Sequence, residues 1–189
     1  MNMMLVPIRI LALTFFAACA LVAVQAQVQR RPPTFKFPET ESEYTVLFPG
    51  KPTIRQIYTA EAEGLEARLS LPESVGLRAE FAQLSAEQAR SLVNLTIEAK
   101  KNLNERRIKN AWEYAETSGL KRAAVRVEDD DRGWCVSVRG YKEFNGVPFI
   151  YETKFFYGKH SVMFLTAAAP SSRFPTPAIS KFYASLKQH

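Results

Sequence analysis

Cysteine is scarce in this chain of 189 residues, which contains only Cys19 and Cys135. Cys19 lies in an N-terminal apolar segment whose removal would leave one cysteine in the mature protein. An intramolecular disulfide is then excluded, so we expect packing alone to stabilise the fold. A single thiol in an oxidising compartment is tolerated best when it is buried as a small hydrophobic group, which predicts a buried Cys135.

Motifs for phosphate binding and catalysis are also missing. The 8 glycines are scattered at expected turns, and no P-loop, G-x-G-x-x-G motif or G-x-S-x-G elbow occurs. Of the 2 histidines, His189 is the last residue, so a catalytic Ser-His or Cys-His pair would need His160, at a predicted turn. We therefore predict no catalytic residue and no bound cofactor. An enzyme would require His160 in a cleft with Cys135, Ser161 or an aspartate.

The one long hydrophobic run lies at the N-terminus. It covers residues 10–24, about 15 residues, whereas a membrane-spanning helix needs roughly 20. Arg9 precedes the run and small residues follow it up to Ala26, which is typical of a secretory signal peptide cut after Ala26. We expect residues 1–26 to be removed and the protein to be periplasmic or secreted.

A lipoprotein is the less favoured alternative. The residues Phe16-Ala17-Ala18-Cys19 resemble the bacterial lipoprotein box, in which the cysteine becomes the lipidated first residue. However, Phe16 stands where the box usually has leucine, and the sequence stays apolar after Cys19 instead of becoming a polar tether. An ordinary cleaved signal peptide is therefore the better interpretation.

The chain that remains is long enough for one domain with a sizeable core. Residues 27–40 contain several prolines and no apolar periodicity, which predicts an extended linker. We therefore predict a single α+β domain over residues 41–189.

Positive charge exceeds negative charge only moderately. The net charge is +6, and the loss of Arg9 with the signal peptide lowers it by one. This excess is too small to indicate a nucleic-acid-binding stripe. Basic residues do cluster in mid-chain, where they could bind an anionic membrane surface or an acidic protein partner, or could be the solvated face of a helix. The cluster comprises Lys100, Lys101, Arg106, Arg107, Lys109, Lys121 and Arg122.

The first half of the domain contains patterns typical of strands. Residues 44–48 and 53–59 flank the turn sequence Pro-Gly-Lys-Pro and suggest a first hairpin. Residues 65–72 and 76–84 alternate apolar with polar side chains, which predicts two further half-buried strands.

A long mid-chain helix is predicted next. Ser85 and Gln88 form a capping-box pattern, so the helix should begin at Ser85 and run to about Thr117. The apolar positions change register after Leu103, which predicts a bend near residues 104–109.

The last third predicts an antiparallel meander over residues 121–169. Asn145-Gly146 is its strongest hairpin signal, because both central residues of a type I′ turn need positive φ. A short C-terminal helix should follow the prolines at 175 and 177 and pack on the sheet. Its apolar positions at helical spacing are Ile179, Phe182, Tyr183 and Leu186.

Three consecutive aspartates, Asp129, Asp130 and Asp131, precede one of the predicted strands. Read as an EF-hand loop, this stretch would place Arg132 at a ligand position and Arg139 where a bidentate carboxylate is required, so we predict no metal site. A weak cation site through Asp129 and Asp131 is the alternative to a solvated connection between two strands.

Aromatic residues in the meander have two interpretations. Phe149, Tyr151, Phe155 and Tyr157 share one face of their strand, and they could form part of the core or could line a pocket for a lipid or another apolar small molecule. The preceding strand should place Trp134, Val136 and Val138 on one face and Cys135 on the other.

The order of these parts resembles the Mog1p/PsbP-like group of secreted or lumenal domains. The marks are F-P-G-K-P at residues 48–52, a strand ending in E-F-A-Q-L-S before a capped helix, the meander, and F-Y-A-S-L at residues 182–186. The resemblance implies an α/β/α sandwich around a mainly antiparallel sheet, with one long helix in mid-chain and a short C-terminal helix. The helical segment at residues 104–117, with its own Trp112, departs from the family's spacing.

The family resemblance also implies an accessory or binding role without catalysis, such as assisting the assembly of a membrane complex. It transfers no catalytic, cofactor-binding or metal-binding residue. We therefore predict an exported, non-enzymatic binding or assembly-accessory protein of the bacterial cell envelope. A carrier or sensor of a small apolar or lipid ligand is the alternative.

Overall fold

The computed structural model of the chain describes residues 33–189, apart from residues 41, 59–62, 94 and 131–132. The predicted signal peptide and the first part of the predicted linker lie outside the described residues. The described elements are, in chain order, β1 (Phe35–Phe37), β2 (Tyr44–Phe48), β3 (Thr53–Tyr58), β4 (Glu63–Leu71), a 3₁₀ turn (Pro72–Ser74), β5 (Val75–Gln83), α2 (Ala86–Val93), α3 (Ile97–Thr117), β6 (Lys121–Asp130), β7 (Gly133–Phe144), β8 (Val147–Tyr157), β9 (Ser161–Pro170), α4 (Pro177–Ala184) and β10 (Lys187–Gln188).

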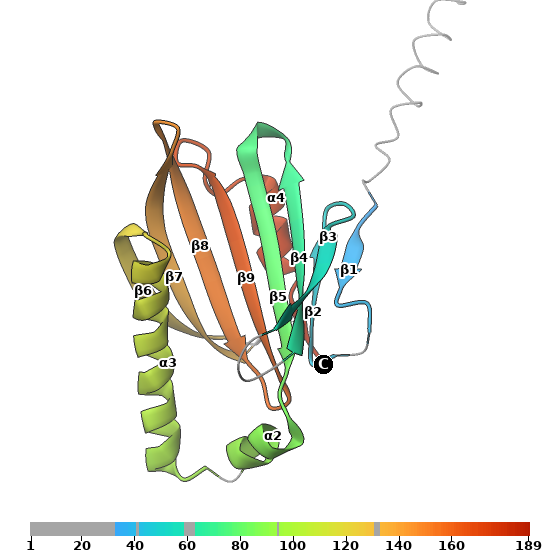
Figure 1. Cartoon of the computed structure of the whole chain (residues 1–189), viewed down its shortest axis with the longest axis vertical. Coiled ribbons are helices and arrows are strands. Elements are labelled where there is room, and N and C mark those ends of the chain that lie inside the picture. Colours follow the sequence, from blue (N-terminus) through green and yellow to red (C-terminus); the bar gives the residue numbers. More distant parts are fainter. Residues whose placement is uncertain (1–32, 41, 59–62, 94, 131–132) are drawn as a thin grey trace, which may run out of the picture. The chain divides into compact units, whose positions relative to one another are not determined.

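The largest element of the fold is a seven-stranded antiparallel sheet (Figure 1), with the strand order β3-β4-β5-β9-β8-β7-β6. Strands β6 to β9 are neighbours in sequence order, which confirms the predicted meander. Asn145 and Gly146 join β7 to β8 with φ angles of 51° and 77°, the positive values that a type I′ turn needs.

A second sheet has three strands in the order β1-β2-β10. Since β2 pairs with β1 and β10 while β3 pairs with β4, the predicted hairpin of residues 44–48 and 53–59 is wrong. Strand periodicity predicts that a segment is extended but does not specify its partner, and here one partner comes from the far end of the chain. Strand β1 lies within the predicted linker, and its Phe37 is fully buried, so the folded part begins before residue 41.

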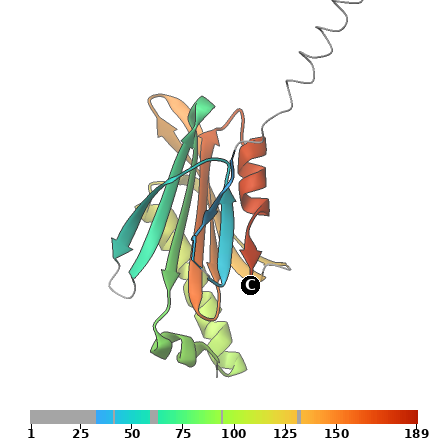
Figure 2. The same cartoon turned by 90° about the vertical axis from the view of Figure 1, so that its right-hand side faces the viewer.

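The main hydrophobic core lies between the small sheet, helix α4 and one face of the large sheet (Figure 2). Helix α4 is capped by Thr176, whose side chain accepts a hydrogen bond from the backbone N–H of Ile179. Its apolar side chains pack as predicted, and the ring centroids of Phe182 and Phe48 are 5.0 Å apart. We call this side of the large sheet the α4 face.

A second core lies on the opposite face, between helix α3 and the strands β6, β7 and β8. Val136 and Val138 belong to this core and Cys135 to the main core, so the predicted alternation along β7 is confirmed. Gly140 permits this packing, because a Cβ there would lie 2.9 Å from Cβ of Leu120. We call this side the α3 face.

The mid-chain helix is interrupted, but not where the sequence suggested. Ser85 and Gln88 form the predicted capping box at the start of α2, with hydrogen bonds of 2.8 and 3.2 Å. The chain then leaves the helix after Val93 and starts α3 with Thr96 as its N-cap, whereas residues 104–109 are continuously helical. The change of apolar register after Leu103 therefore does not mark a bend. Thr96 starts α3 because its side chain accepts a hydrogen bond from the backbone N–H of Ala99 in the new first turn.

The fold is α+β with a mainly antiparallel sheet, as predicted. The layered sandwich that the resemblance implies stays a prediction, because α3 contacts β6 and β7 and leaves the β3–β5 end of its face uncovered. None of the helices in the described ranges has the length and apolarity to cross a membrane.

Candidate functional site: an arginine-lined groove

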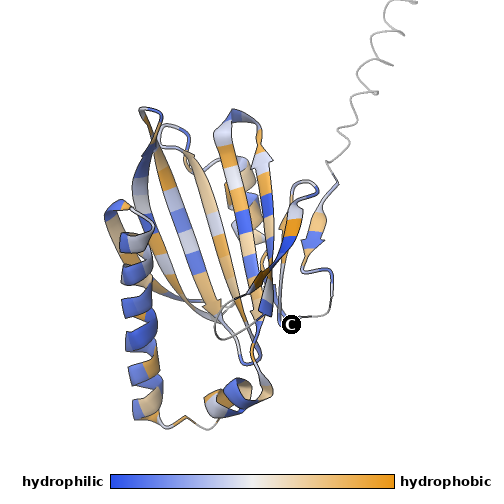
Figure 3. Cartoon of the chain, in the orientation of Figure 1, coloured by the Kyte–Doolittle hydropathy of each residue, from blue (hydrophilic) through white to orange (hydrophobic). Residues whose placement is uncertain are grey.

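Polar side chains occupy the part of the α3 face that α3 does not cover. Along β4 and β5 the apolar residues point to the core and the polar ones to this side, so that hydrophilic and hydrophobic residues alternate (Figure 3). Directly opposite residues of neighbouring antiparallel strands share a face. One row across the sheet is thus Arg68, Arg78, Thr166 and Thr153, and the next is Ser70, Gly76, Ala168 and Tyr151. We call this region, on β3, β4, β5, β9 and the adjoining part of β8, the open face.

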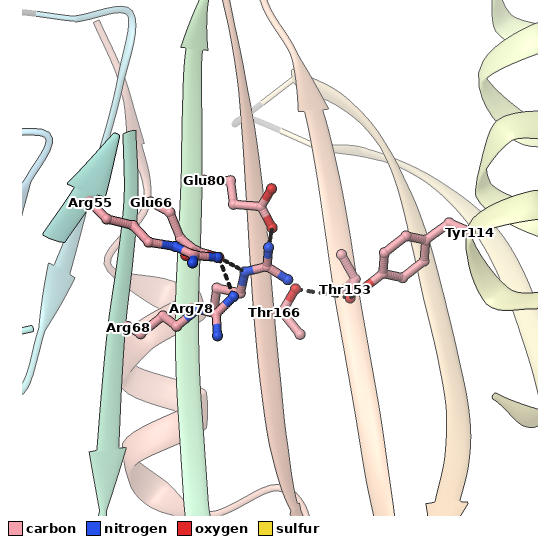
Figure 4. A network of polar contacts seen from close by, with 8 residues as sticks. All are labelled: Arg55, Glu66, Arg68, Arg78, Glu80, Tyr114, Thr153 and Thr166. Carbon is pink, nitrogen blue, oxygen red and sulfur yellow. Dashed lines mark hydrogen bonds and ion pairs between the residues drawn. The ribbon is translucent and has the colours of Figure 1, made fainter. Parts of the chain in front are cut away.

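The centre of the open face is a carboxylate bound by three arginines (Figure 4). Glu66 on β4 has no exposed side-chain surface, and its two oxygens accept hydrogen bonds from Arg55, Arg68 and Arg78 on three adjacent strands. The Arg68–Glu66 contact is 2.8 Å. The arginines are one-third to more than one-half exposed, so they cover the carboxylate and form the surface themselves.

The arginines set the charge of Glu66. Burial raises the pKa of this carboxyl, but the hydrogen bonds from Arg68 and Arg55 and the positive charge of Arg78 more than offset burial and hold the pKa at about 2. Glu66 is therefore charged at neutral pH and fixes the positions of the three guanidinium groups.

A second carboxylate extends this network. Arg78 also binds Glu80 on its own strand at 2.6 Å, while burial raises the pKa of Glu80. Even with both carboxylates charged, three guanidinium groups exceed two carboxylates, so the network has net positive charge.

A chain of hydroxyls links the sheet to α3 beside this network. The Tyr114 hydroxyl on α3 lies 3.1 Å from Oγ1 of Thr153 on β8, and that atom lies 3.0 Å from Oγ1 of Thr166 on β9. Figure 4 shows these side chains in one band with the arginines, from β3 across the sheet to α3.

A groove of about 380 Å³ lies between this band and the C-terminal end of α3. Its floor is hollow because Gly76 and Ala168 are small, and a Cβ at Gly76 would meet no atom within 4 Å. Its described lining contains three cations and no carboxylate. The lining residues are Arg68, Leu69, Ser70, Gly76, Leu77, Arg78, Tyr114, Ser118, Leu120, Lys142, Tyr151, Thr166 and Ala168.

The histidine considered for catalysis lies elsewhere. His160 is exposed at the turn between β8 and β9, and its backbone N–H donates to Oε2 of Glu43 at 2.9 Å. The Ser161 hydroxyl donates to the same oxygen. Cys135 is buried, as predicted, and its thiol lies 4.0 Å from Oε2 of Glu128. A hollow of about 820 Å³ lies beside His160, and Cys135 is not among its lining residues.

Glu43 organises the β8–β9 turn. Burial raises the pKa of its carboxyl, but hydrogen bonds from the backbone N–H groups of His160, Lys159 and Ser161 and from the Gln188 side chain hold the pKa below its usual value. The carboxylate thus satisfies backbone donors of the turn, which is a structural role.

The first two aspartates belong to a strand. Asp129 and Asp130 are the last residues of β6, where they pair with Trp134 and Gly133 of β7, so the predicted connection is wrong for these two residues. Asp131 lies outside the described residues. Within the described ranges, no three His, Cys, Asp or Glu side chains are close enough together to hold a metal ion.

The basic cluster is less uniform than its sequence suggested. Arg107 is half-buried, and its guanidinium carbon lies 4.2 Å from the ring centroid of Tyr157 and 5.3 Å from that of Trp134. Lys109 lies 3.7 Å from Glu113, and Arg106 is exposed. Arg107 therefore belongs to the contact between α3 and the sheet.

The aromatic residues of β8 divide between core and groove. Phe155 packs against Tyr114 and Phe164, with ring centroids 5.2 and 5.0 Å apart, so these rings fill the space between α3 and the sheet. Tyr151 lines the groove. The core interpretation is therefore confirmed for Phe155.

Sequence reasoning missed the arginine network. Its residues are the polar positions of the alternating strands, which on an antiparallel sheet normally face water. Glu66, Arg68, Arg78 and Glu80 occupy polar positions of two predicted strands. The strand register brings them together, and the register was not predicted.

No protein-family model matches the chain, and a search of the curated proteins finds no match. A solved structure of a cyanobacterial PsbP, from Synechocystis sp. PCC 6803, matches it with a TM-score of 0.50 and 10% sequence identity, over 86% of this chain and 96% of that one. The fold is PsbP-like. At 10% sequence identity, this similarity shows a shared fold and nothing about function.

Other solved structures match with TM-scores below 0.5, among them the two that follow. A protein from Bacteroides thetaiotaomicron has a TM-score of 0.49 and 8% identity, covering 82% of this chain, and the chain spans only 48% of that protein. LpqN, which is involved in cell envelope biogenesis of Mycobacterium tuberculosis, has a TM-score of 0.42 and 12% identity, over 82% of this chain and 90% of that one.

Proposed function

We propose that this protein is an exported, non-enzymatic binding or assembly-accessory module of the bacterial cell envelope, and that it binds its ligand in the groove on the open face. The supporting observation is the groove itself, a hollow of ligand size with cations and hydroxyls on a rigid sheet. The export signal predicted for residues 1–26 and the PsbP-like fold are compatible with this role.

The alternative, a carrier of an apolar or lipid molecule between sheet and helix, has less support. Two of the rings that would line such a pocket, Phe155 and Tyr157, pack against Phe164 in the second core. The groove on the open face has a mixed lining with three cations, which does not suit a wholly apolar ligand.

A variant that fills the groove tests the proposal. Gly76→Val adds a β-branched side chain where the structure has open space, so the variant should fold and its groove should be blocked. Protein purified from the envelope fraction of cells is analysed by native mass spectrometry. We expect a bound mass on the wild type that is missing from Gly76→Val, and fractionation should place both proteins outside the cytoplasm. A wild type and variant that carry the same bound mass, or a cytoplasmic protein, would overturn the proposal.

A further inference from the structure

We propose that the groove recognises an oxyanion, a phosphate or carboxylate group, on a molecule that also has an apolar or aromatic part. This inference rests on the proposed function and names the ligand class of the same site.

The first support is charge. Arg68 and Arg78 line one side of the groove and Lys142 lines another. The guanidinium groups of the network exceed its carboxylates by one, and Lys142 adds a further positive charge. An anion in the groove would neutralise this excess, whereas a metal cation would be repelled by it.

The second support is the supply of hydrogen-bond donors. An arginine side chain has five N–H donors. Arg78 binds Glu66 through Nε and Glu80 through Nη2, and Arg68 binds Glu66 through Nη2. Further donors of both guanidinium groups therefore remain for a ligand, and their planar arrangement matches phosphate and carboxylate oxygens.

The third support is preorganisation. Glu66 is fully buried and binds Arg68 and Arg78 from below, which restricts the rotamers of both side chains before a ligand arrives. Less conformational entropy is then lost on binding. Glu66 is thus a positioning residue for the anion site.

The remaining lining explains the second part of the ligand. Leu120 and Ala168 give the groove apolar surface, and Tyr151 contributes an aromatic ring. Lys142 donates a hydrogen bond to the carbonyl oxygen of Ser118 at 3.3 Å, which holds its ammonium group at the end of α3. An amphiphilic anion fits this combination better than a bare inorganic ion.

The experiment uses three small probes with one aromatic scaffold. Phenyl phosphate, benzoate and the neutral benzyl alcohol are titrated into the ¹⁵N-labelled protein and followed by chemical-shift changes. We expect both anions to shift the resonances of Arg78, Tyr151 and Lys142, and benzyl alcohol to bind at least about tenfold more weakly. Equal binding of the neutral probe, or shifts confined to other surfaces, would overturn the inference.

Matched charge variants test the residues. Arg78→Gln and Lys142→Gln each remove a cation from the lining, and Arg55→Gln removes one from the same Glu66 network outside the groove. We expect the first two to weaken phenyl phosphate binding by about tenfold each and Arg55→Gln by less than about twofold. Lys142 is exposed, so its variant should fold in any case. An equal loss in all three variants would indicate a general charge effect and would contradict a specific site.

The source of the anion is decided with vesicles. Phosphatidylcholine vesicles that contain phosphatidylglycerol, but not vesicles without it, should bind the protein and displace phenyl phosphate if the anion belongs to a lipid headgroup. Binding of phenyl phosphate without any vesicle binding would assign a soluble phosphate or carboxylate ligand, and either result supports the oxyanion site.

The outcomes separate the two proposals. If Gly76→Val loses the cellular ligand while phenyl phosphate and benzoate fail to bind the wild type, the oxyanion inference is wrong and the binding function stands. If both anions bind the groove but no cellular ligand is lost in Gly76→Val, the site is shown and the proposed function fails.

Discussion

Tyr114 on α3 and Thr153 on β8 join their hydroxyl groups at 3.1 Å across the boundary between the second core and the open face. The tyrosine ring packs edge-on against Phe155, so one side chain contributes both to the apolar contact and to the polar band. This contact helps to hold the C-terminal half of α3 next to the groove.

We expect Tyr114→Phe to lower the free energy of unfolding by about 1 kcal/mol, because the ring contact remains and a partly buried hydrogen bond is lost. Urea denaturation at pH 7 measures the change. Tyr141→Phe, at an exposed tyrosine of β7, serves as the control and should stay close to the wild type. Equal effects of the two substitutions would contradict a role for the Tyr114 hydroxyl.

Glu66 should make the free energy of unfolding depend on pH in the acidic range. Its pKa in the folded protein is about 2, below the usual 4.5, so its charged form stabilises the fold above pH 4.5, and this contribution is lost as the pH falls towards 2. The three arginines are partly exposed, so solvent screens their attraction for Glu66. We therefore expect the charged carboxylate to contribute about 2–3 kcal/mol to the free energy of unfolding. Glu66→Gln should lose this amount at pH 7 and show a flatter loss of stability between pH 5 and pH 2.

Glu73 provides the matched control for Glu66. Its carboxylate lies 2.6 Å from Arg173, but both side chains are more than half exposed, so Glu73→Gln should change stability by less than about 0.5 kcal/mol. Chemical denaturation across the same pH range compares the two variants. An acid dependence of Glu66→Gln equal to that of the wild type would show that the arginine network does not hold this carboxyl in its charged form.

Substitutions at Arg107 and Arg106 should affect stability differently, although the two residues are neighbours in the basic cluster. Arg107→Gln loses two cation–π contacts with Tyr157 and Trp134, and we expect a cost of about 1 kcal/mol. Arg106→Gln removes an exposed charge and should be nearly neutral. Thermal unfolding measures both, and a change in tryptophan fluorescence should accompany the first substitution only.

Replacing glycine with alanine should lower stability at Gly146 but not at Gly76. Gly146→Ala places a side chain at a φ of 77° in the β7–β8 turn and should destabilise the protein by about 1 kcal/mol. Gly76→Ala enters open space on β5 and should be neutral or stabilising by up to about 1 kcal/mol. Denaturation midpoints compare them, and a destabilised Gly76→Ala would mean that the groove floor is tighter than the structure shows.

Local features of the fold could be predicted from sequence where each residue's own chemistry decided the structure. The Asn145-Gly146 turn, the capping box of Ser85 and Gln88 and the buried faces of β5 and β7 depend on φ preferences, short-range hydrogen bonds and strand periodicity. The bend predicted at residues 104–109 was wrong because a change of apolar register does not by itself interrupt the backbone hydrogen bonds of a helix, whereas the Thr96 side chain caps a new one.

Longer-range relations were decided by the tertiary structure. The pairing of β2 with β10 joins segments from opposite ends of the chain, and no local pattern specifies it. The pairing of Arg78 with Arg68 and Thr166 likewise depends on strand register, which is set by packing on the buried α4 face.

By itself, the sequence determined that this is an α+β domain with a C-terminal meander and helix, because apolar periodicity and turn chemistry are local properties. The sequence did not distinguish an ordinary solvated surface from a candidate binding site on the polar side of the sheet. Only the tertiary structure made that distinction. Register placed three arginines around Glu66, and the position where α3 ends left Gly76 and Ala168 uncovered beside them. The groove is cationic because arginines on separate strands share one buried carboxylate, and the strand register that brings them together has no signature along the chain.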